Sequence, residues 1–492
     1  MGRPTDAAMT PTGVLALARR ELPAALAAVL PTARWYGDKH RDLMGIEIVD
    51  AVADPWGDAI VVWAVAELRF TAGEPSRYAV AAVVELDAAA GAVTADRWFG
   101  DGMSAAGFPA WFLARLRDGA RLAGARGELA FEPLPGLLER VGTDGTPPAQ
   151  VGGLEQSNTN IRYGAVLLVK LFRRLRPGLN PDLEITRFLA ERTTFRHAPR
   201  PLGVVRYLSH DSEPIVAAIA QNFIANGSDG WEWTLRALAA AFGDESRTAA
   251  DSLDAALALL GRRTAEMHRA LASDPNDPAF APEPLTETTI DATVAAALHN
   301  LAATMTALRQ RQGGAPPAMR SAIDEVLASE RALAERLRGM AAERGSWAIR
   351  VHGDYHLGQT LRTMDADWIV LDFEGEPGRD LVERRRKTSA LKDVSGMLRS
   401  IGYARTAAER AQPSAAVKLA AWETVARRAF LDAYLDGVRG AGPRLLPPDA
   451  AAFRRALDAW EADKALYEVR YEVANRPDWL ATPLRALQAA TG

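Results

Sequence analysis

Apolar and polar positions in the first 95 residues predict one helix followed by several strands. The segment GVLALARRELPAALAAVL has the spacing of a helix with one apolar face. The segments IEIVDAVAD, AIVVWAVAELRF and YAVAAVVEL read as antiparallel strands. We therefore expect residues 1–95 to form a small α+β domain.

The pattern becomes β-rich between residues 96 and 225. AWFLARLRDG predicts a helix, and the turn-rich stretch GTDGTPPAQ follows it. AVLLVKLFRRL and PIVAAIAQNFI then predict strands, with the helical segment PDLEITRFLAERT between them. A second, mainly β domain is expected over 96–225.

Residues 226–492 are mostly helical in pattern. Two apolar segments, IRVHGDY and WIVLDFE, interrupt the helices and predict a pair of strands. The order along the chain is thus a β-rich region followed by a helical region that carries a cluster of polar residues. No internal repeat or low-complexity segment is evident.

Composition narrows the class of protein. The 492 residues are 48% hydrophobic and 24% charged, as in a globular chain with a sizeable core. A net charge of −4 argues against a nucleic-acid partner, which usually meets a basic face. The absence of cysteine excludes disulfides and thiolate chemistry. No signal-peptide pattern or bilayer-length apolar run is present, so we expect a soluble, cytoplasmic protein without a membrane partner.

The polar cluster lies in VHGDYHLGQTLR and WIVLDFEGEP. His352 and His356 are four residues apart, as in a helical zinc pair, but β-branched residues and glycines argue against a helix there. A polar loop without chemistry is the other simple interpretation. Two apolar segments bracket the loop, however, and would direct its carboxylates toward one point.

Phosphoryl transfer accounts for more of the cluster. Kinase-type enzymes carry a base Asp, an amide ligand for Mg²⁺ five residues later, and a second Asp on the next strand. Asp354 and Gln359 are five residues apart, and Asp372 lies 18 residues beyond Asp354. The pattern indicates Asp354 as the general base and Gln359 and Asp372 as the metal ligands.

Such an enzyme needs a nucleotide site upstream. Lys170 lies in the apolar strand VLLVKLF, and Glu184 follows it by 14 residues in a helix. A strand Lys paired with a helix Glu orients ATP phosphates in kinases. The alternative is an edge-strand lysine that reaches water.

Two further segments are candidates for the nucleotide. Ser157 and Thr159, in QSNTN, lie where a loop would cover phosphate, although the segment lacks glycine-rich spacing and also fits a hairpin turn. Gln221, Phe223 and Ile224 fit an adenine-binding linker by their position in the chain.

The motifs resemble those of a known family. HGDYHLGQTL, DFEGEP, ERRRKTSALKDVSGMLRSIGYA and ALYEVRYEVANRPDWL are similar to segments of the actinobacterial maltokinase-like enzymes and their glucosamine kinase relatives. The resemblance covers most of the chain. It implies a bilobal, eukaryotic-protein-kinase-like α+β fold, with an N-terminal cap (1–95), an N-lobe (96–225) and a mostly helical C-lobe (226–492).

The resemblance also implies ATP- and Mg²⁺-dependent phosphorylation of a sugar hydroxyl, by a monomer or a homodimer. Asp354 would be the catalytic base, and Glu374 would join Gln359 and Asp372 near the metal or the sugar. Lys170, paired with Glu184, would bind phosphate.

The choice of acceptor rests on departures from the maltokinase pattern. Ile401 replaces an aromatic residue and Gly402 replaces an Asp, which suits a monosaccharide better than a disaccharide. We therefore expect glucosamine, phosphorylated at its 6-hydroxyl, ahead of maltose, phosphorylated at its 1-hydroxyl. The candidate acceptor residues are His356, Glu376, Asp393, Arg399, Tyr467, Glu468 and Glu472.

Three other functions stay open on the sequence. An antibiotic phosphotransferase of the aminoglycoside type shares the chemistry but is disfavoured by DFEGEP and the cap. A pseudokinase that binds nucleotide would not need Lys170, Asp354, Gln359 and Asp372 together. A zinc hydrolase is the most distant alternative.

Overall fold

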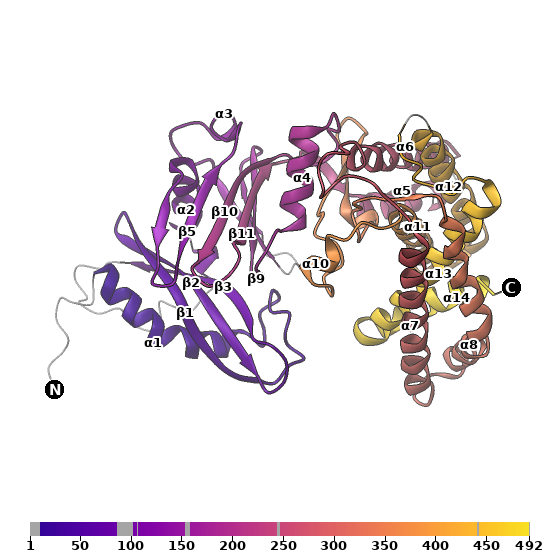
Figure 1. The fold of residues 1–492 in the computed structure, drawn as a ribbon, viewed down its shortest axis with the longest axis horizontal. Coiled ribbons are helices and arrows are strands. Elements are labelled where there is room, and N and C mark those ends of the chain that lie inside the picture. Colours follow the sequence, from indigo (N-terminus) through magenta and orange to yellow (C-terminus); the bar gives the residue numbers. More distant parts are fainter. Residues whose placement is uncertain are drawn as a thin grey trace. The chain divides into compact units, whose positions relative to one another are not determined.

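The computed structural model describes residues 10–85, 102–105, 107–152, 158–243, 247–439 and 442–491. The chain divides into two compact units, shown in the sequence colours of Figure 1. The first comprises Met1–Arg187 and Pro199–Ala225, and the second comprises Phe188–Ala198 and Asn226–Gly492. Within the described ranges, no helix has both the length and the apolar character needed to cross a membrane. The division into 1–95, 96–225 and 226–492 stays a prediction.

The first unit opens with the predicted helix and the predicted antiparallel strands. Helix α1 (Pro11–Val29) begins after Thr10, whose hydroxyl caps it by accepting from Gly13 N at 3.2 Å. Its apolar face, including Val14, Ala18 and Leu22, packs on a four-stranded sheet of order β1-β2-β3-β9. The strands are β1 (Leu43–Trp56), β2 (Ala59–Phe70), β3 (Ser76–Glu85) and β9 (Arg174–Leu175).

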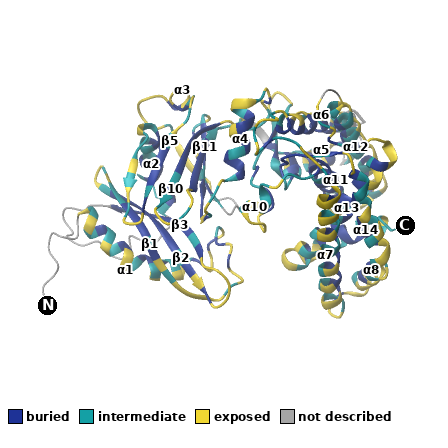
Figure 2. Ribbon diagram, viewed as in Figure 1, coloured by how far each residue is buried: buried dark blue, intermediate teal, exposed yellow. Residues whose placement is uncertain are grey.

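The second sheet of this unit has seven antiparallel strands in the order β4-β5-β10-β11-β8-β7-β6. Its strands are β4 (Arg121–Ala123), β5 (Gly127–Pro133), β6 (Ala149–Gly152), β7 (Asn158–Tyr163), β8 (Leu167–Phe172), β10 (Pro201–Ser209) and β11 (Ile215–Asn222). The helices of this region are α2 (Gly107–Asp118), α3 (Leu137–Val141) and α4 (Pro181–Arg192). The central strands of both sheets are buried (Figure 2).

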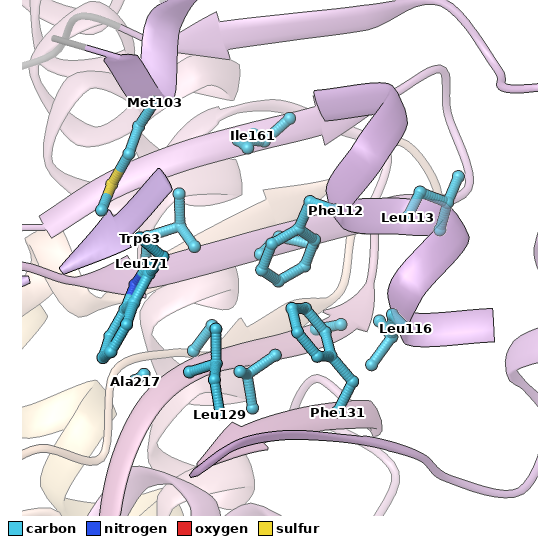
Figure 3. Packing of buried hydrophobic residues seen from close by; sticks show 14 of the residues in the cluster. Trp63, Met103, Phe112, Leu113, Leu116, Leu129, Phe131, Ile161, Leu171 and Ala217 are labelled. Atoms are coloured by element: carbon cyan, nitrogen blue, oxygen red, sulfur yellow. The ribbon is translucent and has the colours of Figure 1, made fainter. Parts of the chain in front are cut away.

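One apolar core joins the two sheets through α2. Figure 3 shows Trp63 of β2, Phe112 of α2 and Phe131 of β5 within it. The rings of Phe112 and Phe131 meet edge to face, with centroids 5.6 Å apart. Each such side chain contributes roughly 1.5–3 kcal/mol by leaving water. The core therefore fixes the frame on which β7 and β8 are held.

The second unit is mostly helical, as predicted. Its helices are α5 (Gly230–Gly243), α6 (Arg247–Leu271), α7 (Glu287–Gln312), α8 (Pro317–Ala328), α9 (Glu330–Leu337), α10 (Leu381–Arg384), α11 (Leu391–Ala411), α12 (Ala416–Val438), α13 (Ala450–Asn475) and α14 (Ala481–Ala489). Helices α6 and α12 approach so closely that a Cβ at Gly261 would lie 2.1 Å from Phe430 O. Helix α11 is buried along most of its length, so it forms the centre of this unit.

The predicted strand pair differs from the observed one. The strand before the polar loop, β14 (Trp347–Ala348), has two residues and pairs with β13 (Glu283–Pro284). The strand after the loop is β15 (Thr360–Thr363), which pairs with β16 (Trp368–Val370) and with β12 (Asn226–Asp229). At His352, Gly353 and Asp354, side-chain atoms and not a neighbouring strand accept from the backbone N–H groups.

Candidate active site

A buried carboxylate of α11 holds the polar loop in place. Asp393 Oδ2 accepts from His352 N at 2.7 Å, and Asp393 Oδ1 accepts from Gly353 N at 2.9 Å. His268 Nε2 lies 3.1 Å from Asp393 Oδ2 and donates to it, because a carboxylate oxygen only accepts. Burial would raise the pKa of Asp393, but the hydrogen bond from His268 and the backbone N–H of Gly353 hold it below its usual value. The ionised carboxylate of Asp393 thus fixes the loop through hydrogen bonds to two backbone N–H groups.

His352 ties this loop to the next strand. Its Nε2 donates to Leu371 O at 2.7 Å, and its Nδ1 accepts from Asp354 N at 3.3 Å. Both ring nitrogens therefore have backbone partners. Gly353 has a φ of +88°, and a Cβ there would lie 3.3 Å from Gly375 Cα, so only glycine fits the turn. The backbone next to Asp354 is therefore held in one conformation.

Asp354 faces a lysine that the sequence analysis missed. Lys464 Nζ of α13 lies 3.3 Å from Asp354 Oδ1, and the two side chains are 19% and 21% exposed. Burial would lower the pKa of Lys464, but the carboxylates of Asp354, Glu376 and Glu468 raise it above its usual value. Lys464 is therefore charged, and it orients the carboxylate predicted to be the base.

The predicted metal ligands Gln359 and Asp372 face each other. Gln359 Nε2 lies 3.2 Å from Asp372 Oδ2, and Leu371 N donates to Gln359 O at 2.9 Å. Asp372 has a φ of +61°, a conformation that costs a non-glycine residue on the order of 1–3 kcal/mol and that is concentrated at functional sites. Amide and carboxylate oxygens are the donors that Mg²⁺ prefers, so this set fits that ion.

Glu374 and His356 lie on either side of this pair in the sequence. The Glu374 backbone carbonyl accepts from Arg384 Nη1 at 3.3 Å, and its carboxylate lies 4.0 Å from the same guanidinium. His356 Nδ1 accepts from Gly358 N at 3.1 Å, where it caps a 3₁₀ turn. Burial lowers the pKa of His356, so the ring is neutral. Its contact with the acceptor stays a prediction.

A cavity of about 600 Å³ opens beside the loop. Gly353 and Tyr355 contribute to its wall, together with residues of α7, of the segment 375–396 and of α13. The cavity lies entirely within the helical unit. It is the natural place for an acceptor molecule, because it begins at the residues next to Asp354.

Glu376 and Tyr467 are the predicted acceptor residues that line this cavity. Glu376 is buried, lies 3.2 Å from Lys392 Nζ and forms an ion pair with Arg379. Burial would raise the pKa of Glu376, but the charges of Lys392 and Arg379 lower it to about 2. Its charge is already balanced by the protein.

The other predicted acceptor residues serve the packing of the helices. Arg399 of α11 donates to Glu468 of α13 at 2.7 and 3.0 Å. Glu472 accepts from Tyr403 at 3.0 Å and from Arg476 at 2.7 Å. Neither these residues nor Asp393 line the cavity, and their contact with the acceptor stays a prediction. All of them lie inside the bundle, where a periodic pattern does not distinguish a ligand from an ion-pair partner.

Ile401 and Gly402 do not border the cavity. Ile401 is fully buried in α11, and a Cβ at Gly402 would lie 3.0 Å from Glu423 Oε1. The residue types at these two positions therefore reflect helix packing. The expectation of a monosaccharide from these two positions stays a prediction.

Lys170 in the first unit pairs with a carboxylate next to the predicted one. Its Nζ lies 3.2 Å from Asp182 Oδ2, and both residues are largely shielded from water. Asp182 and Glu184 both belong to the first turn of α4. The pairing of Lys170 with Glu184 stays a prediction.

The remaining nucleotide candidates are placed as follows. Ser157 lies outside the described residues, and Thr159 Oγ1 accepts from Arg173 Nε at 2.7 Å. Gln221 is the penultimate residue of β11, and Phe223 N donates to Val166 O at 3.1 Å. Gln221, Phe223 and Ile224 are half-buried, so each has a side chain partly open to a ligand.

The chain is similar to known glucosamine kinases over most of its length. No family model matches it. A glucosamine kinase of Streptacidiphilus jiangxiensis is 29% identical over 403 residues, with 76% of this chain and 84% of that protein covered. A glucosamine kinase of Mycolicibacterium smegmatis is 27% identical over 336 residues, with 68% and 78% covered.

A solved structure of a glucosamine kinase in complex with glucosamine, ADP and inorganic phosphate has the same fold. It matches with a TM-score of 0.64 at 24% identity, and the match covers 96% of this chain and 99% of that one. The likeness confirms the predicted fold class, and the similarity in sequence confirms the relationship inferred from the motifs.

Proposed function

We propose that this relative of the glucosamine kinases transfers the γ-phosphoryl group of ATP to a sugar hydroxyl in a Mg²⁺-dependent reaction. The favoured acceptor is glucosamine, and the product is then glucosamine 6-phosphate. The observation that carries the proposal is the position of Asp354. Asp393 accepts hydrogen bonds from the loop backbone, and this loop holds Asp354 next to a cavity lined by polar side chains. The similarity in sequence supports the choice of acceptor.

Asp354 acts on the acceptor in this proposal. Its carboxylate accepts a hydrogen bond from the reacting hydroxyl and takes the proton as the oxygen bonds to the γ-phosphorus. The bond from phosphorus to the bridging oxygen breaks, and ADP leaves. Lys464 holds the carboxylate at 3.3 Å and keeps it from turning away. Positioned proton acceptors of this kind contribute about 10²–10⁴-fold in rate.

Gln359, Asp372 and Glu374 would hold Mg²⁺. The bound ion would neutralise charge on the β- and γ-phosphates. Gln359 Nε2 lies 3.2 Å from Asp372 Oδ2, so these two side chains are already close together. In the first unit, Lys170 would bind phosphate, while Gln221, Phe223 and Ile224 would contact adenine.

The first test measures ADP release from Mg·ATP with a panel of acceptors. The panel contains glucosamine, N-acetylglucosamine, glucose, maltose, trehalose and kanamycin. We expect turnover on glucosamine and little on the others. Ile401 and Gly402 do not border the cavity, so they give no reason to prefer glucosamine over maltose as the acceptor, and the assay decides between the two. Turnover on maltose or kanamycin alone would contradict glucosamine as the acceptor, and no turnover on any compound would contradict the kinase.

A further inference from the structure

Three carboxylates line the cavity beside Asp354, and two of them have cationic partners. Glu376 pairs with Lys392 and Arg379, and Glu383 lies 3.8 Å from the Arg379 guanidinium. Asp463 of α13 is the third. Over the ranges that the structure describes, Asp463 forms no ion pair with a basic side chain. Among the described residues, Asp463 thus differs from the other two carboxylates in having no direct ion pair, although the charges of Lys392 and Arg379 act on it at longer range.

Asp463 is held by an amide and not by a cation. Asn300 Nδ2 of α7 donates to Asp463 Oδ1 at 2.6 Å and to its backbone carbonyl at 3.2 Å. Burial raises the pKa of Asp463 and the charge of Glu376 adds to this rise, whereas the Asn300 hydrogen bond and the charges of Lys392 and Arg379 oppose it. A carboxylate in this setting gains from a positively charged ligand, because desolvation without a partner is costly.

Aromatic residues flank Asp463 on the same helix face. Asp463 and Lys464 lie three and four residues after Trp460, and Tyr467 lies four and three residues after them, which places all four on one side of α13. The Trp460 ring is fixed because its Nε1 donates to Glu343 Oε1 at 2.6 Å. A carboxylate between two aromatic side chains suits a compact cation attached to a sugar ring.

We infer that Asp463 binds the ammonium group of an amino-sugar acceptor through Oδ2, while Asn300 occupies Oδ1. The inference rests on the proposed function and adds the residue that selects an amino sugar over a neutral one. The acidic residues of the predicted acceptor set already have partners. Glu376, Glu468 and Glu472 pair with cations, and Asp393 binds the polar loop. Asp463 was not among them.

The test compares kcat/KM of the wild type and of Asp463→Asn with glucosamine, glucose and N-acetylglucosamine. Loss of a charged hydrogen bond lowers kcat/KM for glucosamine by about 10- to 100-fold. The value for glucose changes by no more than about twofold, since the introduced amide oxygen still accepts from Asn300 and keeps the wall in place. The preference for glucosamine over glucose therefore collapses.

Asp458→Asn is the matched control. Asp458 lies five residues earlier on α13 and pairs with Arg336 at 2.9 Å, away from this cavity. We expect Asp458→Asn to leave the preference for glucosamine over glucose unchanged. Asp463→Glu retains the charge and is expected to keep the preference for glucosamine even where both rates fall, which separates recognition of charge from damage to the fold.

An equal loss on glucosamine and glucose, or an unchanged ratio, would overturn the role of Asp463 while the kinase proposal stands. Calorimetric titration with glucosamine separates the two proposals. If the wild type phosphorylates no sugar, the proposed function fails. Binding of glucosamine that is lost in Asp463→Asn would still support the inference, and binding that is absent or equal in both proteins would refute it.

Discussion

At the scale of single residues, the proposed phosphoryl transfer depends on Asp354 more than on any other side chain. Asp354→Asn should lower kcat by at least about 10²-fold, because the amide cannot take the proton of the acceptor hydroxyl. The dissociation constant for Mg·ATP should stay within about threefold of the wild-type value, since Asp354 acts on the acceptor. Steady-state kinetics and calorimetry measure the two quantities.

The exposed residue Asp365, in the turn between β15 and β16, supplies the control for this substitution. Asp365→Asn should leave kcat unchanged, because it removes the same charge from the same stretch of chain without touching the loop. A residual kcat above about a tenth of wild type in Asp354→Asn would rule out the role of general base.

At the scale of elements, a buried carboxylate couples the end of a 3₁₀ helix (Arg338–Glu343) to α11 and α13. Glu343 accepts from Trp460 Nε1 at 2.6 Å and from the Ser389 hydroxyl, and it is 3% exposed. Burial raises its pKa from 4.5 to about 7, although both hydrogen bonds oppose the rise. The junction of the three elements is therefore most stable with Glu343 protonated.

The sign of the pH dependence follows from this shift. Between pH 4.5 and about 7 the folded protein binds more protons at Glu343 than the unfolded chain does. The contribution of this group to the free energy of unfolding is therefore full below pH 4.5 and falls by about 3 kcal/mol as pH rises to 7. Glu343→Gln should remove that decline, because the amide oxygen still accepts from Trp460.

Denaturant unfolding of the wild type and of Glu343→Gln at pH 5 and pH 8 measures the effect. The difference between the two proteins should be larger at pH 8, where the wild type must bury a charge. Equal differences at both pH values would show that Glu343 does not titrate in this range.

At the same scale, the spacing of residues along the chain predicts some residues of the site and not others. The residues from His352 to Asp372 could be predicted because their chemistry is local, with fixed spacings across one loop. Lys464 and Asp463 could not, because they reach the cavity from α13, about a hundred residues further along the chain. Buried and half-buried positions surround that helix, so periodicity does not indicate which face meets a cavity.

The predicted acceptor residues show the same difficulty. Glu468, Glu472 and Arg399 have the residue types of a sugar site, yet each has its partner inside the bundle. Asp182 and Glu184 lie on one turn of α4, and spacing alone does not distinguish them as partners of Lys170. The β-rich and helical regions were predictable from the apolar pattern along the chain, whereas the strand pair around the polar loop was not, and the fold class followed from the resemblance of the motifs.

At the scale of the whole molecule, the oxygen ligands proposed at Gln359 and Asp372 lead us to expect activity that depends on Mg²⁺. Chelation of divalent ions should abolish turnover, and added Mg²⁺ should restore it, whereas Zn²⁺ should not, because Zn²⁺ favours nitrogen and sulfur donors. Asp372→Ala should weaken binding of Mg·ATP by about tenfold or more while leaving metal-free ATP binding nearly unchanged, since the lost carboxylate acts through the ion. Calorimetry with and without Mg²⁺ measures both. Restoration of activity by Zn²⁺ alone would point instead to a hydrolase built on His352 and His356, an outcome that their backbone hydrogen bonds oppose.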